Sequence, residues 1–183
     1  MVVADTGIRQ DLETVIHGYC EVVDDLITLA MYPFVTGYIY NRVVRWKRHV
    51  KAPSSRELTP SVITRLTKSF TEQNRIELLK LRAARLGKGE VCAVDTTSRS
   101  SYGDSLADMR RGRNKEGLPL KQTLEVIVYS LTNHMPVYYR TFPGNIPDCR
   151  SLDVILADMD HAGFKNPVLV TDRGFESLRN LER

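Results

Sequence analysis

The spacing of apolar residues along the chain changes near Glu90. Before this point apolar side chains recur at helical intervals, as at Val62, Leu66 and Phe70, which lie four residues apart. After it the apolar residues form short runs, such as residues 91–94, that are typical of buried strands. The pattern therefore predicts a mostly helical first half and an α/β second half.

The first 57 residues are expected to form a helical region followed by a connection. Residues 1–50 have a helical pattern with a break at Pro33, because proline cannot continue the hydrogen-bonding of a helix. The apolar run 26–40 is too short to span a bilayer comfortably and is better explained as a buried helix. Residues 51–57 (KAPSSRE) are polar and contain a proline, which indicates a linker.

Two further helices are expected between this linker and the change of pattern. Thr59 and Pro60 are a favourable N-cap and first-turn pair for the first of them. Ser69 and Glu72 have the spacing of a capping box that would start the second, and Gly87 would end it. Two short helices in succession leave room for a helix-turn-helix.

The second half is expected to fold in the order β-β-β-α-β. The predicted elements are strands at 90–97, 122–132 and 135–142, a helix at 149–161 with Asp148 as its N-cap, and a strand that ends at Thr171. The short turn at 133–134 makes the second and third strands a hairpin. This order can place the first and fourth strands side by side in one sheet.

An aspartate follows the apolar part of each of these two strands. Asp95 ends the run VCAV, and Asp172 ends the run VLVT. Either residue alone is explained as readily by a turn or a helix cap, but the two together in this order of elements favour a shared site. Two carboxylates held close together repel each other unless a cation lies between them, and Mg²⁺ prefers such hard oxygen ligands. The sequence therefore indicates a metal site at these strand ends.

The basic residues are unevenly distributed, although the net charge is only +4. Residues 1–25 hold one basic and six acidic side chains, whereas residues 42–56 hold six basic side chains and no acidic one. A second basic segment, residues 99–121, holds six basic and three acidic side chains. Such segments suit a polyanion, and a solvated surface is the alternative explanation. The three cysteines are widely spaced, without the spacing of a metal site, which is typical of a reduced, cytosolic protein. No signal peptide is expected, because Asp5 and Asp11 occupy the place of a basic n-region.

Four stretches together resemble a known family. They are AVDTTSRSSYG (93–103), RRGRNKEGLPLKQ (110–122), MPVYYRTFPGNIPD (135–148) and VLVTDRGF (168–175). In this order they resemble the DDE transposases of bacterial insertion sequences, of the insertion-sequence-four kind, from about residue 88 onward. The resemblance implies a ribonuclease-H-like core with a mixed sheet at 88–183, preceded by linker and helices at 51–87 and by a helical region at 1–50 that could bind DNA ends.

The resemblance also implies the chemistry. Asp95 and Asp172 would be the first two residues of an acidic triad that holds two Mg²⁺ or Mn²⁺ ions, with Asp95 contacting both. Water would cleave a phosphodiester at the end of the element, and the freed 3′-hydroxyl would attack target DNA. The expected partners are terminal inverted repeats, target DNA and further copies of the chain assembled on DNA, in the prokaryotic cytoplasm at the nucleoid, with no membrane involved.

The basic side chains are candidates for contacts with the DNA backbone, which position nucleic acid without reading its sequence. One group lies between the first two strands, a second in the helical region, and Arg173 directly follows Asp172. The candidates are Arg110, Arg111, Arg113, Lys115, Lys121, Arg173, Arg42, Arg45, Lys47 and Arg48. Arg173 could equally pair with a neighbouring carboxylate, and Trp46 is expected to bury its ring in the core.

The third acidic residue of the family, a glutamate on a later helix, has no counterpart in these 183 residues. Glu176 and Glu182 follow Asp172 too closely to match it. The sequence therefore indicates a truncated or partial copy, inactive by itself, and the alternative function is a non-catalytic DNA-binding or inhibitory fragment. A sugar-kinase-like ATPase is a weaker alternative, because no glycine-rich nucleotide loop follows Asp95.

Overall fold

The computed structural model describes residues 5–36, 40–101, 109–111, 120–146 and 148–172. The chain forms two compact units, Met1–Leu78 and Leu79–Arg183, which we call the helical unit and the sheet unit. The boundary lies inside one helix, α6, so that this helix contributes residues to both units. The predicted assignment of residues 1–50, 51–87 and 88–183 to separate roles stays a prediction.

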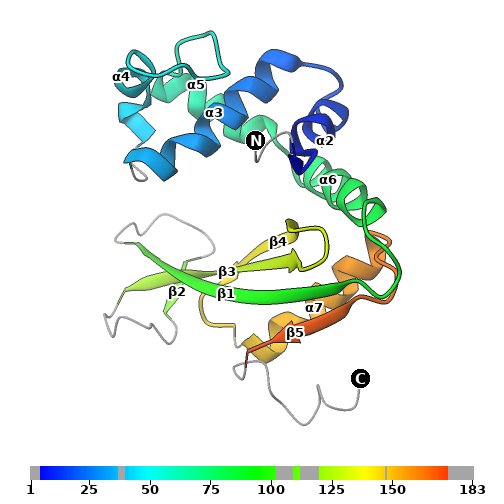
Figure 1. The fold of residues 1–183 in the computed structure, drawn as a ribbon. Helices are drawn as coiled ribbons and strands as arrows, with labels where there is room; N and C mark the ends of the chain where they lie inside the picture. Colours follow the sequence, from blue (N-terminus) through cyan, green and yellow to red (C-terminus); the bar gives the residue numbers. More distant parts are fainter. Residues whose placement is uncertain (1–4, 37–39, 102–108, 112–119, 147, 173–183) are drawn as a thin grey trace. The chain divides into compact units, whose positions relative to one another are not determined.

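The helical unit is built from short helices around a small apolar core (Figure 1). Its elements are α2 (Ile8–Val15), α3 (Cys20–Thr36), the 3₁₀ turn η1 (Tyr40–Arg42), α4 (Val43–Lys47), α5 (Pro60–Ser69) and the first part of α6 (Glu72–Ala84). Tyr32 and Val43 are buried in this core, and Trp46 packs against it with its ring edge-on to Tyr32, 5.3 Å between centroids. The expected core position of Trp46 is confirmed.

The helix starts in this unit follow from local hydrogen bonds. Thr59 caps α5 as predicted, since its hydroxyl accepts from the Val62 amide at 3.4 Å. The predicted Ser69–Glu72 capping box is wrong by two residues. Thr71 and Asn74 exchange the reciprocal bonds instead, from the Thr71 amide to Asn74 Oδ1 at 2.8 Å and from the Asn74 amide to Thr71 Oγ1 at 3.3 Å. Asparagine can therefore take the third helical position of a capping box, where glutamate was expected.

The sheet unit contains a mixed sheet, as predicted. Its strands are β1 (Val91–Ser101), β2 (Arg110–Arg111), β3 (Lys121–Ser130), β4 (Met135–Pro143) and β5 (Val168–Thr171). β3 pairs antiparallel with β1 on one side and with β4 and β2 on the other, while β5 runs parallel to β1. The central order is thus β4-β3-β1-β5, which confirms the predicted ribonuclease-H-like arrangement.

One face of this sheet is covered. Helix α7 (Asp148–His161) and the second part of α6 supply Ile155, Met159, Leu79 and Ala83 to a core shared with the strands. On this face the strands contribute buried residues such as Val94, Val126 and Val128. Figure 1 shows α7 lying along one side of the sheet.

No single helix in the described ranges combines the length and apolar character needed to cross a membrane. The bent pair Cys20–Val35 and Tyr40–Lys47 passes the same test by length and composition only.

Candidate active site on strands β1 and β5

The two candidate aspartates meet through the pairing of β1 with β5. The parallel register pairs Ala93 with Val170 and Val94 with Thr171. Continuation of this register by one residue would place Asp95 beside Asp172, the first residue after β5. Neighbouring strands lie about 4.8 Å apart, and laterally paired side chains point to the same face. Both aspartates are exposed.

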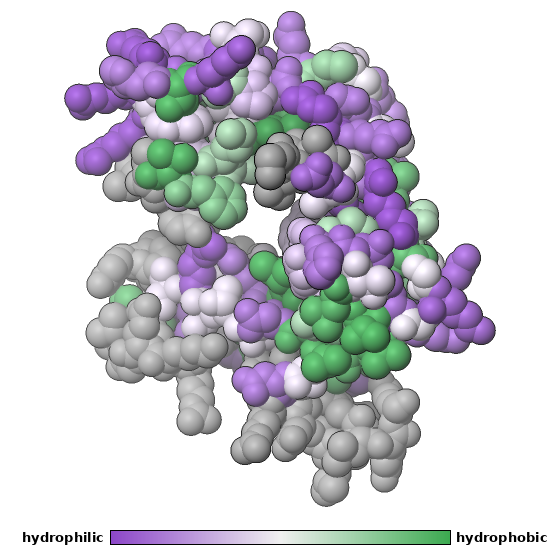
Figure 2. All heavy atoms as spheres, viewed as in Figure 1, coloured by the Kyte–Doolittle hydropathy of each residue, from purple (hydrophilic) through white to green (hydrophobic). Residues whose placement is uncertain are grey.

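The aspartates lie on the uncovered face of the sheet. Cys92 and Val94 on β1 are buried on the opposite face, and residues alternate between the faces along a strand. Asp95 pairs across the strands with Ile127, and Ile127 pairs with Tyr139, which continues the row on the same face. Ile127 and Tyr139 are 45% and 43% exposed. Figure 2 shows hydrophobic side chains gathered over the β1 and β5 part of this unit.

The donor atoms at this position fit a hard divalent cation. Two carboxylates on adjacent strands supply oxygen ligands, and exposed Thr97 follows Asp95 on the same face. Glu125 pairs with Thr97 and is thus the next carboxylate on this face, but Arg99 Nε forms an ion pair with Glu125 Oε1 at 2.9 Å. Among the residues that the structure describes, no group of three His, Cys, Asp or Glu side chains could hold a metal ion. A third carboxylate would have to come from elsewhere.

Part of the predicted basic surface lies on the same face as the aspartates. Lys121 pairs with both Ser101 and Arg111, and Ser101 is six residues beyond Asp95 on β1. An even separation keeps the face, and six residues of strand span about 20 Å. Arg111 and Lys121 are therefore cross-strand neighbours on the face of Asp95, about 20 Å away.

The remaining basic candidates are distributed differently. Arg110 pairs with Gln122, whose side chain is buried. Arg110 therefore belongs to the face opposite to that of Asp95, although Arg110 itself is exposed at the sheet edge. Arg113, Lys115 and Arg173 lie outside the described residues. In the helical unit Arg42, Arg45 and Arg48 are exposed, whereas Lys47 is half-buried.

Lys47 and Arg48 both have partners in the helical unit. Lys47 Nζ donates to Ser54 Oγ at 3.2 Å and to the Arg56 carbonyl oxygen, which fastens the loop after α4. Arg48 approaches Glu57 at 3.9 Å, with both side chains mostly exposed. An exposed pair of this kind contributes little stability, so Arg48 can exchange its partner for a ligand at low cost.

The loop 51–57 is polar, as predicted, and it is anchored to α3 by buried hydrogen bonds. Ser54 is buried, and its amide donates to Thr28 Oγ1 at 2.9 Å while its hydroxyl donates to Asp25 Oδ1 at 2.6 Å. Arg56 forms an ion pair with Asp25 Oδ2. This attachment could not be predicted from the sequence, because both partners of Ser54 lie 26 or more residues away.

A buried carboxylate also fixes the start of β1. Glu90 accepts from Ser130 Oγ and from the Thr132 amide at 3.3 Å, and the Asn133 amide donates to Ser130 Oγ at 2.9 Å. The Ser130 hydrogen bond lowers the pKa of Glu90 below its ordinary 4.5. Burial, with a smaller contribution from the Glu90 charge, raises the pKa of the neighbouring Cys92 thiol to about 11. Cys92 is therefore an unreactive core residue.

The segment 135–148, which contains β4 and contributes to the family resemblance, has structural explanations. A Cβ at Gly144 would lie 2.2 Å from the Gln122 carbonyl oxygen, so only glycine fits where β4 leaves β3. Arg140 forms an ion pair with Asp158 of α7, and the Tyr138 hydroxyl donates to the same Oδ2 atom at 2.9 Å. These contacts lock β4 to the helix. The side chain of Asp148 lies outside the described set.

Residues 86–183 match the family model of the transposase DDE domain, and the chain belongs to this family. The match covers the segment that the resemblance indicated. Comparisons with curated proteins and with solved structures gave no match.

Proposed function

We propose that the sheet unit supplies two of the metal-holding carboxylates for metal-dependent phosphodiester cleavage and strand transfer on the DNA of an insertion sequence of the insertion-sequence-four kind. The observation that carries this proposal is the β1–β5 register. Val94 pairs with Thr171, and the residue that follows each of them is an aspartate. Family membership supports a transposase, and Ile127 and Tyr139 are exposed on the same face of the sheet as Asp95.

The roles of the residues follow from their positions. Asp95 and Asp172 would hold Mg²⁺ or Mn²⁺ through their carboxylate oxygens. Bound ions of this kind supply Lewis-acid stabilisation of the attacking and leaving oxygens in phosphoryl transfer. Arg111 and Lys121 contact the DNA backbone farther along the same face and so orient the scissile phosphate. Arg113, Lys115 and Arg173 are proposed to add to these contacts, and Arg42 and Arg45 to contact terminal repeats.

The third carboxylate is proposed to come from outside the described residues, since the described ones offer no group of three. The same observation supports a second candidate function, a non-catalytic DNA-binding or inhibitory role. The two functions differ in one measurable respect, because only the first requires metal-dependent cleavage. Assembly of several copies on DNA at the nucleoid belongs to both proposals.

The test measures metal binding and cleavage separately. Calorimetric titration with Mn²⁺ is performed on the full chain and on Asp95→Asn, Asp172→Asn and Asp160→Asn, the last being an exposed aspartate on α7 as a matched control. We expect each site variant to weaken Mn²⁺ binding at least about tenfold, the loss seen even for outer-sphere partners, and the control to bind normally. Unchanged binding in both site variants would remove the aspartates from the site.

Nicking of supercoiled plasmid in Mn²⁺ then distinguishes the two functions. Nicking that disappears in Asp95→Asn and persists in Asp160→Asn supports the enzyme. Mn²⁺ binding without nicking, together with salt-sensitive DNA binding, supports the non-catalytic role.

A further inference from the structure

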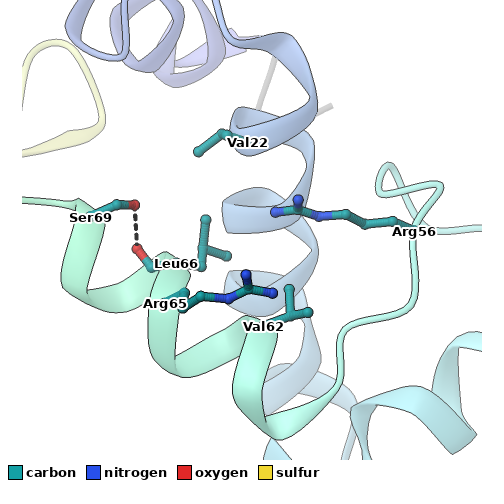
Figure 3. A pocket seen from close by; sticks show the side chains of 6 residues that line it. All are labelled: Val22, Arg56, Val62, Arg65, Leu66 and Ser69. Carbon is teal, nitrogen blue, oxygen red and sulfur yellow. Dashed lines mark hydrogen bonds between the residues drawn. The ribbon is translucent and has the colours of Figure 1, made fainter.

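A hollow in the surface of the helical unit brings together two arginines. It has a volume of about 230 Å³ and is lined by Val22, Arg56, Val62, Arg65, Leu66 and Ser69. We call it the Arg56–Arg65 hollow. In Figure 3 the two arginine side chains reach in from opposite sides, Arg56 from the loop and Arg65 from α5, and their guanidinium groups point toward one another. Asp25 offsets the charge of Arg56, so the charge of Arg65 is the one that an anion in the hollow would balance.

One of the two arginines is held in position. Asp25 is 1% exposed and forms an ion pair with Arg56, whose side chain is 46% exposed. Ser54 fixes Asp25 in turn through its hydroxyl. The Arg56 guanidinium therefore has one part fastened to the interior and another part open to the hollow. A ligand that binds there contacts a guanidinium group that is already ordered, so binding costs less side-chain conformational entropy.

The other arginine has no acidic partner in the described part of the chain. Arg65 is exposed on α5, and no ion pair or hydrogen bond of its side chain is present among the described residues. The floor beneath both guanidinium groups is formed by Val22, Val62 and Leu66. An apolar floor lowers the local dielectric and strengthens the attraction for an anion. Ser69 adds no free donor, because its hydroxyl donates to the Leu66 carbonyl at 2.8 Å.

The surroundings favour a polyanion over a single carboxylate. A second hollow adjoins the first through Arg56 and is lined by Lys47, Arg48 and Glu57 among others. Together the two hollows present four basic side chains (Arg65, Arg56, Lys47 and Arg48) and one acidic side chain (Glu57). Cations at successive positions suit the repeating charges of a nucleic-acid backbone.

We propose that the Arg56–Arg65 hollow binds a backbone phosphate of DNA, with Arg65 and Arg56 as its two cationic walls. The assignment of DNA as the ligand rests on the proposed transposase function, whereas the hollow itself belongs to the helical unit and takes no part in the metal chemistry. Arg65 is the informative residue, because its removal leaves the buried Asp25 paired.

The experiment measures binding of a fluorescent duplex of about 20 base pairs to the full chain in EDTA, across a salt series. Each phosphate contact contributes about 0.9 to the slope of log K against log salt, which is about eightfold in affinity for each tenfold change in salt. We expect Arg65→Ala to reduce the slope by about 0.9 and Arg65→Lys to retain it. Arg150→Ala, an exposed arginine on α7, is the matched control and should keep the wild-type slope.

A second variant tests the other wall of the hollow. The double variant Asp25→Asn/Arg56→Gln removes both members of the buried pair, and circular dichroism verifies that it is folded. We expect it to lose the same increment of slope as Arg65→Ala. If both variants bind the duplex with the wild-type slope, the hollow is not a phosphate site.

A polyglutamate peptide distinguishes the remaining ligand class. Arg65→Ala that weakens binding of polyglutamate but not of DNA would overturn the proposal in favour of an acidic peptide. Absence of duplex binding by the wild-type chain would also overturn it. Because EDTA excludes the metal chemistry, an unchanged slope leaves the Mn²⁺ and nicking results for Asp95 and Asp172 unaffected, so the two proposals fail separately.

Discussion

Each of the two units contains a buried carboxylate that fixes a loop, but the counter-groups differ. In the helical unit Asp25, 1% exposed, is met by the Ser54 hydroxyl and by the cation of Arg56. In the sheet unit Glu90, 7% exposed, is met by the Ser130 hydroxyl and the Thr132 amide. One carboxylate is balanced by a full charge, the other by dipoles.

This difference decides what each loop can do at the surface. Hydroxyl and amide groups of the hairpin satisfy the Glu90 carboxylate, so these contacts serve the fold alone. A cation satisfies Asp25, and the half-exposed Arg56 side chain extends from the interior to a surface hollow. A buried carboxylate paired with arginine can thus position a binding group, whereas one paired with hydroxyl and amide groups stabilises the fold alone.

The comparison predicts that Arg56→Ala has the largest effect on stability. It leaves the Asp25 carboxylate buried without its cation, which costs about 3–5 kcal/mol for a buried pair, and we expect the lower end because Arg56 is half exposed. Urea unfolding followed by Trp46 fluorescence measures it, since Trp46 packs in the core of the helical unit.

The matched control is the double variant Asp25→Asn/Arg56→Gln. Removal of both charges should recover most of the lost stability, because the penalty arises from the unpaired carboxylate and not from the loss of a favourable pair. A double variant as unstable as Arg56→Ala would contradict this interpretation and would make the arginine itself the stabilising group.

Ser130→Ala is expected to have the next largest effect, about 1–3 kcal/mol. Ser130 is fully buried, and its hydroxyl both donates to Glu90 and accepts from the Asn133 amide. The alanine leaves both partners without this bond. Hydrogen exchange of the β3–β4 hairpin amides measures the loss within the sheet unit.

Thr141→Ala, at an exposed position on β4, is the control for this prediction. Thr141 takes no part in the contacts with Glu90 among the described residues. Exchange in this variant should match the wild-type chain. Equal acceleration in Thr141→Ala and Ser130→Ala would show that hairpin side chains in general, and not the Glu90 contacts, hold the turn.

The strands and the two aspartates could be predicted from the sequence because their signals are local. Apolar runs define β1 and β5, and each run leads directly into its aspartate, Asp95 or Asp172. The element order then restricts the possible pairings enough to bring the two strands together. The register itself, Val94 with Thr171, became visible only in the structure, because it pairs residues that lie far apart in the chain.

The anchoring of the loop 51–57 and the Arg56–Arg65 hollow could not be predicted in this way. Both depend on contacts between residues far apart in sequence, such as Ser54 with Asp25, and a polar segment has the same composition whether it is free or fastened. Arg65 is one exposed basic residue among 26 and acquires meaning only from its position opposite Arg56. The capping box at Thr71 and Asn74 shows the same limit on a smaller scale, since Ser69 and Glu72, two residues earlier, have the same spacing.

The smallest expected effect is a dependence of stability on pH that Glu90 contributes. Its pKa in the folded chain lies below the ordinary 4.5, because Ser130 and Thr132 donate hydrogen bonds to the ionised form. A depressed pKa contributes stability that is fully present above about pH 4.5 and is lost as the pH falls through the folded value. Unfolding of the sheet unit, measured between about pH 3 and 6, should therefore show an acid loss that is reduced in Glu90→Gln. The difference should be smaller than the effect of Ser130→Ala, because protonated Glu90 still accepts from the Thr132 amide. Parallel pH curves for the wild-type chain and Glu90→Gln would mean that the Glu90 charge does not stabilise the hairpin. The contrast with Asp25 and its charged partner would then be one of geometry alone.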